Sequence, residues 1–124
     1  MAEEGFIPAI FYGGGGGLRR LLRDVEGRYG DAFDDLGPGA LQDLKHLIDC
    51  IDSFLDLLAD PRTGFRVKLM DYGRIRNDVL EFCQFYAKLL GNPLMERLRH
   101  EIYELLEEAV SWWGEQDILD IIGS

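Results

Sequence analysis

Histidine–carboxylate pairs are the groups in this chain whose types and spacing come closest to acid–base chemistry. His100 lies one helical turn from both Glu96 and Glu104, and His46 follows Asp43 by three residues. A neighbouring carboxylate orients an imidazole or raises its pKa, which makes His100 with Glu96 or Glu104 the candidate centre of a small acid–base enzyme. Because an acidic helical surface produces such neighbours by chance, exposed and structurally neutral histidines are the favoured interpretation.

No pattern in the sequence indicates a metal or another cofactor. A di-iron bundle needs two Glu-x-x-His pairs, whereas Glu96 and His100 are four residues apart and have no second copy. The five glycines at 13–17 precede no Gly-Lys-Ser/Thr sequence, so they do not form a phosphate-binding loop. Cys50 and Cys83 fall on apolar helix faces, where a free cysteine behaves as a small hydrophobic residue. We therefore expect no cofactor.

The composition is that of an acidic globular chain with a hydrophobic core. Its 124 residues are enough for one domain, and 47% of them are hydrophobic. The 13 basic and 23 acidic side chains give a net charge of -10, which argues against affinity for nucleic acid or anionic lipid. The apolar runs are too short to span a bilayer, and the acidic N-terminus is unlike a secretory signal. The expected location is intracellular, in the cytoplasm or the nucleus.

Apolar residues repeat at steps of three and four along most of the chain, which is the spacing of one helix face. This period covers residues 18–29, 41–58, 75–89 and 94–113, and residues 118–122 suggest a short last helix. Pro38 is placed to begin the second helix, Gly91 to end the third, and Asn92-Pro93 to begin the fourth. Asp71 is the expected N-cap of the third helix, after an extended connector or helix start at 65–69. The predicted fold is all-α: a compact bundle of four main helices plus a short C-terminal helix.

The first 17 residues differ from the rest of the chain. An apolar cluster within residues 1–12 consists of Phe6, Ile7, Ile10, Phe11 and Tyr12. The glycines of residues 13–17 are expected to form a flexible tether, followed by a single helical domain over residues 18–124. The apolar cluster is a candidate partner-binding element, docking either in cis or in trans. An ordinary poorly ordered terminus and an engineered glycine run are alternatives that the sequence leaves open.

Three short segments carry more information than helix periodicity. They are Asp71-Tyr72-Gly73-Arg74-Ile75 ahead of an apolar run, Trp112-Trp113-Gly114 near the C-terminus, and Tyr29-Gly30-Asp31-Ala32-Phe33. In this order they resemble the first, second and third homology regions of the Bcl-type apoptosis regulators, virus-encoded members included. Asp71 and Tyr72 stand where that family usually has Asn and Trp.

The resemblance implies a groove that accepts a partner helix. Gly73 would let the partner approach the backbone closely, and Arg74 would offer a bidentate hydrogen bond to a partner's aspartate. Leu69, Val79 and Phe82 would line the groove. The expected function is a non-enzymatic module that binds a helix or short peptide of another protein, with apoptosis regulation as its most specific form. A viral or cellular adaptor docking through residues 1–12 and the acid–base enzyme at His100 are the alternatives, and the oligomeric state stays open.

Overall fold

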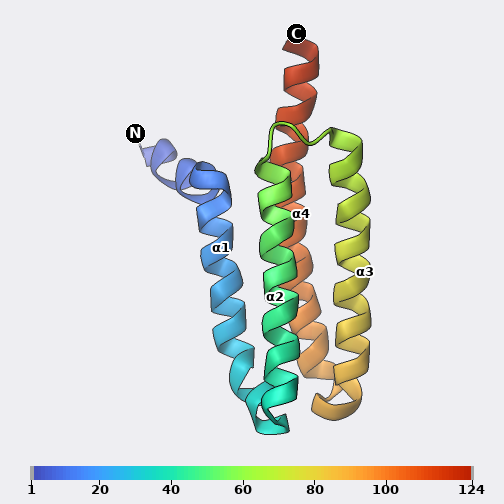
Figure 1. Ribbon diagram of the computed structural model, residues 1–124. Coiled ribbons are helices and arrows are strands. Elements are labelled where there is room, and N and C mark those ends of the chain that lie inside the picture. The colour runs from blue at the N-terminus through green and yellow to red at the C-terminus, as the bar shows by residue number, and fades with distance from the viewer. Residues whose placement is uncertain (1, 124) are drawn as a thin grey trace.

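Four helices form an up-and-down bundle in the computed structural model, which describes the backbone of residues 2–123 and the side chains of residues 17–111 (Figure 1). The helices are α1 (Ala2–Leu36), α2 (Pro38–Ala59), α3 (Phe65–Leu90) and α4 (Asn92–Gly123). The most extensive contacts join α1 to α2 and α3 to α4, while α2 and α3 touch less. This arrangement confirms the predicted all-α bundle of four main helices.

Two connections between helices follow directly from the predicted glycine and proline signals. Gly37 has a φ of 130°, a conformation that L side chains avoid, and Pro38 follows it as the first residue of α2. At the other connection Gly91 has a φ of 97°, and its N–H donates to the carbonyl of Ala87 at 2.9 Å. Both turns bring consecutive helices into antiparallel contact.

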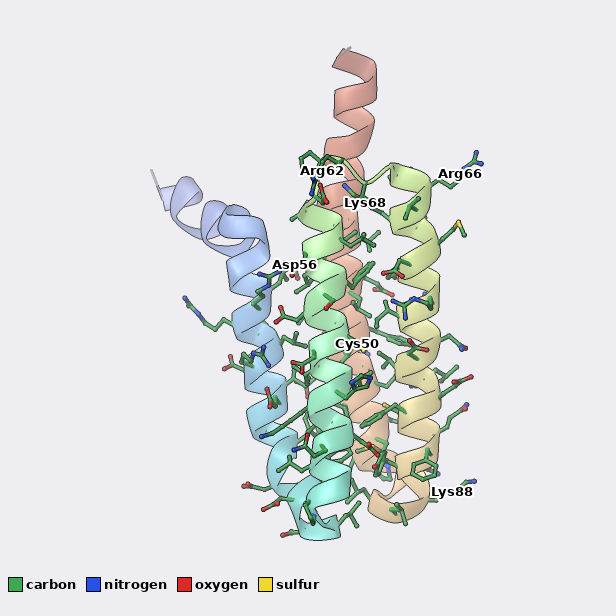
Figure 2. The ribbon with its side chains drawn as sticks, viewed as in Figure 1. Cys50, Asp56, Arg62, Arg66, Lys68 and Lys88 are labelled. Carbon is green, nitrogen blue, oxygen red and sulfur yellow. The ribbon has the colours of Figure 1, made fainter. Side chains whose placement is uncertain are left out.

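The third helix starts earlier than predicted. Gly64, in extended conformation, is the residue before the first turn, and α3 begins at Phe65. Asp71 therefore lies inside the helix, and its predicted role as N-cap is wrong. Residues 65–69, which alternate between apolar and basic types, are helical. Lys68 packs inward, with 5% of its surface exposed, while Arg66 points away from the bundle (Figure 2).

The structure tests the predictions for the two ends of the chain only in part. The helix α1 begins at Ala2, but the side chains of residues 1–16 lie outside the described part of the chain. The division into residues 1–12, 13–17 and 18–124 thus stays a prediction. A separate short C-terminal helix is not shown, since α4 extends from Asn92 to Gly123 as one helix. Within the described residues, no helix combines the length and apolarity needed to cross a membrane.

The core runs along the bundle axis and draws on all four helices. Its fully buried side chains include leucines and isoleucines of α2 and α4 together with two phenylalanines, Phe33 of α1 and Phe54 of α2. Phe33 stacks on Phe82 with ring centroids 5.5 Å apart and meets the edge of Tyr86 at 4.9 Å. This aromatic cluster fastens the C-terminal end of α1 to α3.

Two buried tyrosines add polar connections between helices. The hydroxyl of Tyr86 on α3 donates to a carboxylate oxygen of Asp43 on α2 at 2.5 Å. The hydroxyl of Tyr29 on α1 donates to Glu101 on α4, which also pairs with Arg28. Burial, reinforced by the carboxylate that accepts each hydrogen bond, raises the pKa of both tyrosines from the ordinary 10.0 to about 12.

These pKa values predict a loss of stability at high pH. A tyrosine whose pKa is higher in the folded state stabilises the fold fully below its unfolded pKa, and the contribution disappears as the pH rises through the folded pKa. We therefore expect the free energy of unfolding to fall between pH 10 and pH 12. Urea denaturation followed by circular dichroism across this range measures the slope. The slope should flatten in the double variant Tyr29→Phe/Tyr86→Phe, and an equal slope in both proteins would contradict the assignment.

Candidate partner-binding groove between the second and third helices

Two hollows lie along the line where α2 and α3 face each other, and we call them together the seam groove. The larger, of about 610 Å³, is lined by Ser53, Phe54 and Leu57 of α2 and by Val67, Met70, Asp71 and Arg74 of α3. The smaller, of about 210 Å³, is lined by Asp43, His46, Leu47, Cys50, Asp78 and Phe82. Since the two helices are antiparallel, the hollows follow one another along the seam. Cys50 marks the middle of α2 in Figure 2.

The groove is lined by residues beside the core-facing set of each helix, together with two core residues of α2, Leu47 and Phe54. On α2 the lining residues recur from 43 to 57 at steps of three and four, and on α3 they recur in the same way from 67 to 82. Such steps keep side chains on one side of a helix. Val67 and Met70 are 52% and 70% exposed, which leaves apolar surface open at the wider end of the groove.

Arg74 lies between the two hollows and is held by two aspartates of its own helix. Its Nε atom is 2.8 Å from Asp71 Oδ1, and its Nη1 atom is 3.0 Å from Asp78 Oδ2. The hydrogen bond to Asp71 raises the pKa of Arg74, so the guanidinium keeps its charge. Asp71 and Arg74 line the larger hollow and Asp78 lines the smaller one. The centre of the seam groove is thus charged, and a partly apolar hollow lies on each side of it.

Some of the predicted partner-binding residues reach this groove. Arg74 lines the larger hollow, and Phe82 lines the smaller one while it stacks on Phe33. Gly73 is exposed, and a Cβ atom built there would meet nothing within 4 Å. Leu69 is 43% exposed but lines neither hollow.

The helical rotation explains this separation. At about 100° per residue, Leu69 and Gly73 lie toward the α4 side of α3, whereas Met70 and Arg74 lie toward α2. The five predicted residues of α3 therefore do not share one surface.

Val79 lines neither hollow. Its side chain has no exposed surface and packs in the core. The reason is its register: Val79 stands four residues after Ile75 and four before Cys83, and all three belong to the buried set of α3. Sequence reasoning instead missed Val67 and Met70, because it placed them before the start of the helix.

The N-terminal candidates cannot be placed in the same way. The side chains of Phe6, Ile7, Ile10, Phe11 and Tyr12 lie outside the described residues, as do those of Trp112 and Trp113. Their proposed contacts stay predictions.

The side chains of both histidines, His46 and His100, are exposed on the surface of the bundle. His100 Nε2 lies 3.1 Å from Glu104 Oε2, with the side chains 71% and 67% exposed. Glu96 faces a different hollow, between α3 and α4. His46 Nε2 lies 3.7 Å from Cys50 Sγ at the edge of the seam groove. In the part of the chain that the structure describes, no group of three or more His, Cys, Asp or Glu side chains is arranged to hold a metal ion.

Comparison of the chain with known protein families, curated protein sequences and solved structures finds no match. The structure by itself shows a four-helix bundle with two partly apolar hollows along the seam between α2 and α3. The resemblance to Bcl-type regulators depends on the residues quoted above and stays a prediction.

Proposed function

We propose that this protein is a non-enzymatic interaction module that binds an amphipathic helix of another protein along the seam groove. The observation that carries the proposal is the larger hollow of about 610 Å³, lined by Phe54, Leu57, Val67 and Met70 with Arg74 at its rim. Exposed apolar side chains beside a charged group are the usual composition of a helix-binding groove.

The length of the groove sets the length of the partner. On α3 the lining residues extend from Val67 to Phe82, a distance of about 22 Å at 1.5 Å per residue. A partner helix of about four turns fills this distance. Its apolar side chains, at one-turn spacing, would enter the larger hollow first, because Val67 and Met70 are already exposed there.

Arg74 is the residue proposed to orient the partner. Its two ion pairs are solvent-exposed, with the arginine side chain 56% accessible, and such pairs contribute only about 0.3–0.5 kcal/mol each. A partner's aspartate can therefore take the place of Asp71 or Asp78 at little cost, and form a charge-assisted hydrogen bond in a less hydrated setting. Apoptosis regulation is the narrow form of the proposal, supported by the Bcl-type resemblance of residues 71–75.

A labelled helical peptide with a Leu-x-x-x-Gly-Asp core tests the proposal by fluorescence anisotropy. We expect Arg74→Glu and Met70→Glu each to weaken binding about tenfold or more, which corresponds to about 1.4 kcal/mol. Arg20→Glu, which makes the same charge change on exposed α1, is the control for Arg74. Leu69→Glu is the control for Met70, since it adds the same charge next to it but outside the groove.

The same variants also show which binding results would contradict the proposal. If Leu69→Glu weakens binding while Met70→Glu does not, the partner helix occupies the α4 side of α3 and the seam groove is not the site. If no peptide of this pattern binds, or if Arg20→Glu weakens binding as much as Arg74→Glu, the proposal is wrong in its mechanism.

A further inference from the structure

Another hollow, of about 550 Å³, lies between α3 and α4. It is lined by Leu80, Cys83, Gln84, Ala87 and Lys88 of α3 and by Asn92, Met95, Glu96 and Arg99 of α4. These residues flank the turn that connects the two helices, and Figure 2 shows Lys88 at this lower end of α3. The volume falls in the range of pockets that bind small molecules.

The floor of this hollow is apolar and uncharged. Cys83 and Met95 are buried, with 4% and 1% of their surfaces exposed, and Ala87 packs against the core beside them. Burial raises the pKa of the Cys83 thiol from 9.0 to about 11, which keeps the sulfur protonated at neutral pH. An aliphatic group placed here would therefore be removed from water without meeting a charge.

The rim is cationic in a chain that is otherwise strongly acidic. Among the described residues, neither Lys88 nor Arg99 has a carboxylate within ion-pair distance, so neither charge is neutralised by a neighbouring acid. The guanidinium of Arg99 instead lies 5.4 Å from the ring centre of Tyr103. The first turn of α4 carries no acidic residue, so its N–H groups add positive potential at the same place.

We propose that the hollow between α3 and α4 binds a small amphiphilic anion, with its aliphatic body on the Cys83 and Met95 floor and its anionic head between Lys88 and Arg99. Two cations without a carboxylate partner among the described residues, beside a buried apolar surface, match the two ends of such a molecule. Glu96, the carboxylate among the lining residues, opposes the head group and limits the affinity.

Decanoate, kept below its micelle-forming concentration, is the probe, titrated into the full chain and followed by amide chemical shifts. Saturable shifts should concentrate on residues 80–99. The neutral decanol and the cationic decyltrimethylammonium should bind about tenfold more weakly or not at all, and octyl phosphate should bind like decanoate if the head-group charge is what matters.

Charge variants make the test specific to the site. Lys88→Gln and Arg99→Gln should each weaken decanoate binding several-fold, Glu96→Gln should strengthen it, and Arg97→Gln, on the exposed surface of α4, should leave it unchanged. Equal binding of decanoate and decanol, shifts scattered over the surface, or no effect of Glu96→Gln would overturn the proposal. The result does not depend on the seam groove, because no peptide partner enters the experiment.

Discussion

Replacing Phe33 by Ala is expected to lower the free energy of unfolding by about 3–5 kcal/mol. The side chain is fully buried, and its ring contacts Phe82 at 5.5 Å and Tyr86 at 4.9 Å between centroids. Its removal leaves a cavity that the two α3 rings cannot fill without leaving their own positions. It also removes the aromatic connection between α1 and α3, which otherwise make few contacts.

Phe85→Ala is the matched control for this prediction. Phe85 belongs to the same aromatic group, with its ring 5.0 Å from that of Tyr86, yet it is 58% exposed. Truncation there should change the stability by no more than about 1 kcal/mol, since little buried surface is lost. Guanidinium denaturation of both variants, followed by circular dichroism, measures the difference. Similar losses for the two variants would show that Phe33 does not anchor the end of α1.

The Phe33→Ala substitution is also expected to affect the seam groove. Phe82 lines the smaller hollow and stacks on Phe33 from the other side. The position of Phe82 is thus set by a residue that does not itself line the groove. A partner helix that extends to the smaller hollow would bind more weakly to Phe33→Ala even under conditions where the variant is fully folded.

The turns of this fold could be predicted from the sequence because their causes are local. Gly37 and Gly91 have positive φ values that only glycine adopts readily, and the prolines at 38 and 93 are compatible with a first helical turn. No information about distant residues is needed to place such signals. These turn signals divide the chain into its main helices, so the number of main helices could be predicted as well.

The start of α3 could not be predicted for the opposite reason. Residues 65–69 alternate between apolar and basic types, a pattern that also fits an extended segment. In the structure these residues are helical, and only 5% of the surface of Lys68 is exposed. The local pattern does not show which of these side chains packs against other helices.

The Bcl-type resemblance singled out Arg74, and the structure places this residue at the rim of the larger hollow. The choice between Val79 and Met70 as wall residues depends instead on how α3 is rotated in the bundle. Apolar residues occupy several sides of α3, from Leu69 through Met70 to Val79. A helix with so many apolar positions does not show by itself which ones face the core.

Val79→Asp tests this rotation directly, and it is expected to destabilise the fold by at least about 3–5 kcal/mol. The new carboxylate would be buried in a position with no exposed surface, with apolar core residues such as Ile75 and Cys83 beside it. Met70→Asp introduces the same charge at a side chain that is 70% exposed, so its effect on stability should stay within about 0.5 kcal/mol. If Val79→Asp does not fold, Val79→Thr supplies the comparison, with an expected cost of about 1–3 kcal/mol for its buried hydroxyl. Urea denaturation measures all three variants. Equal stability of the Val79 and Met70 variants would mean that α3 is rotated differently about its axis. A different face of α3 would then line the seam groove.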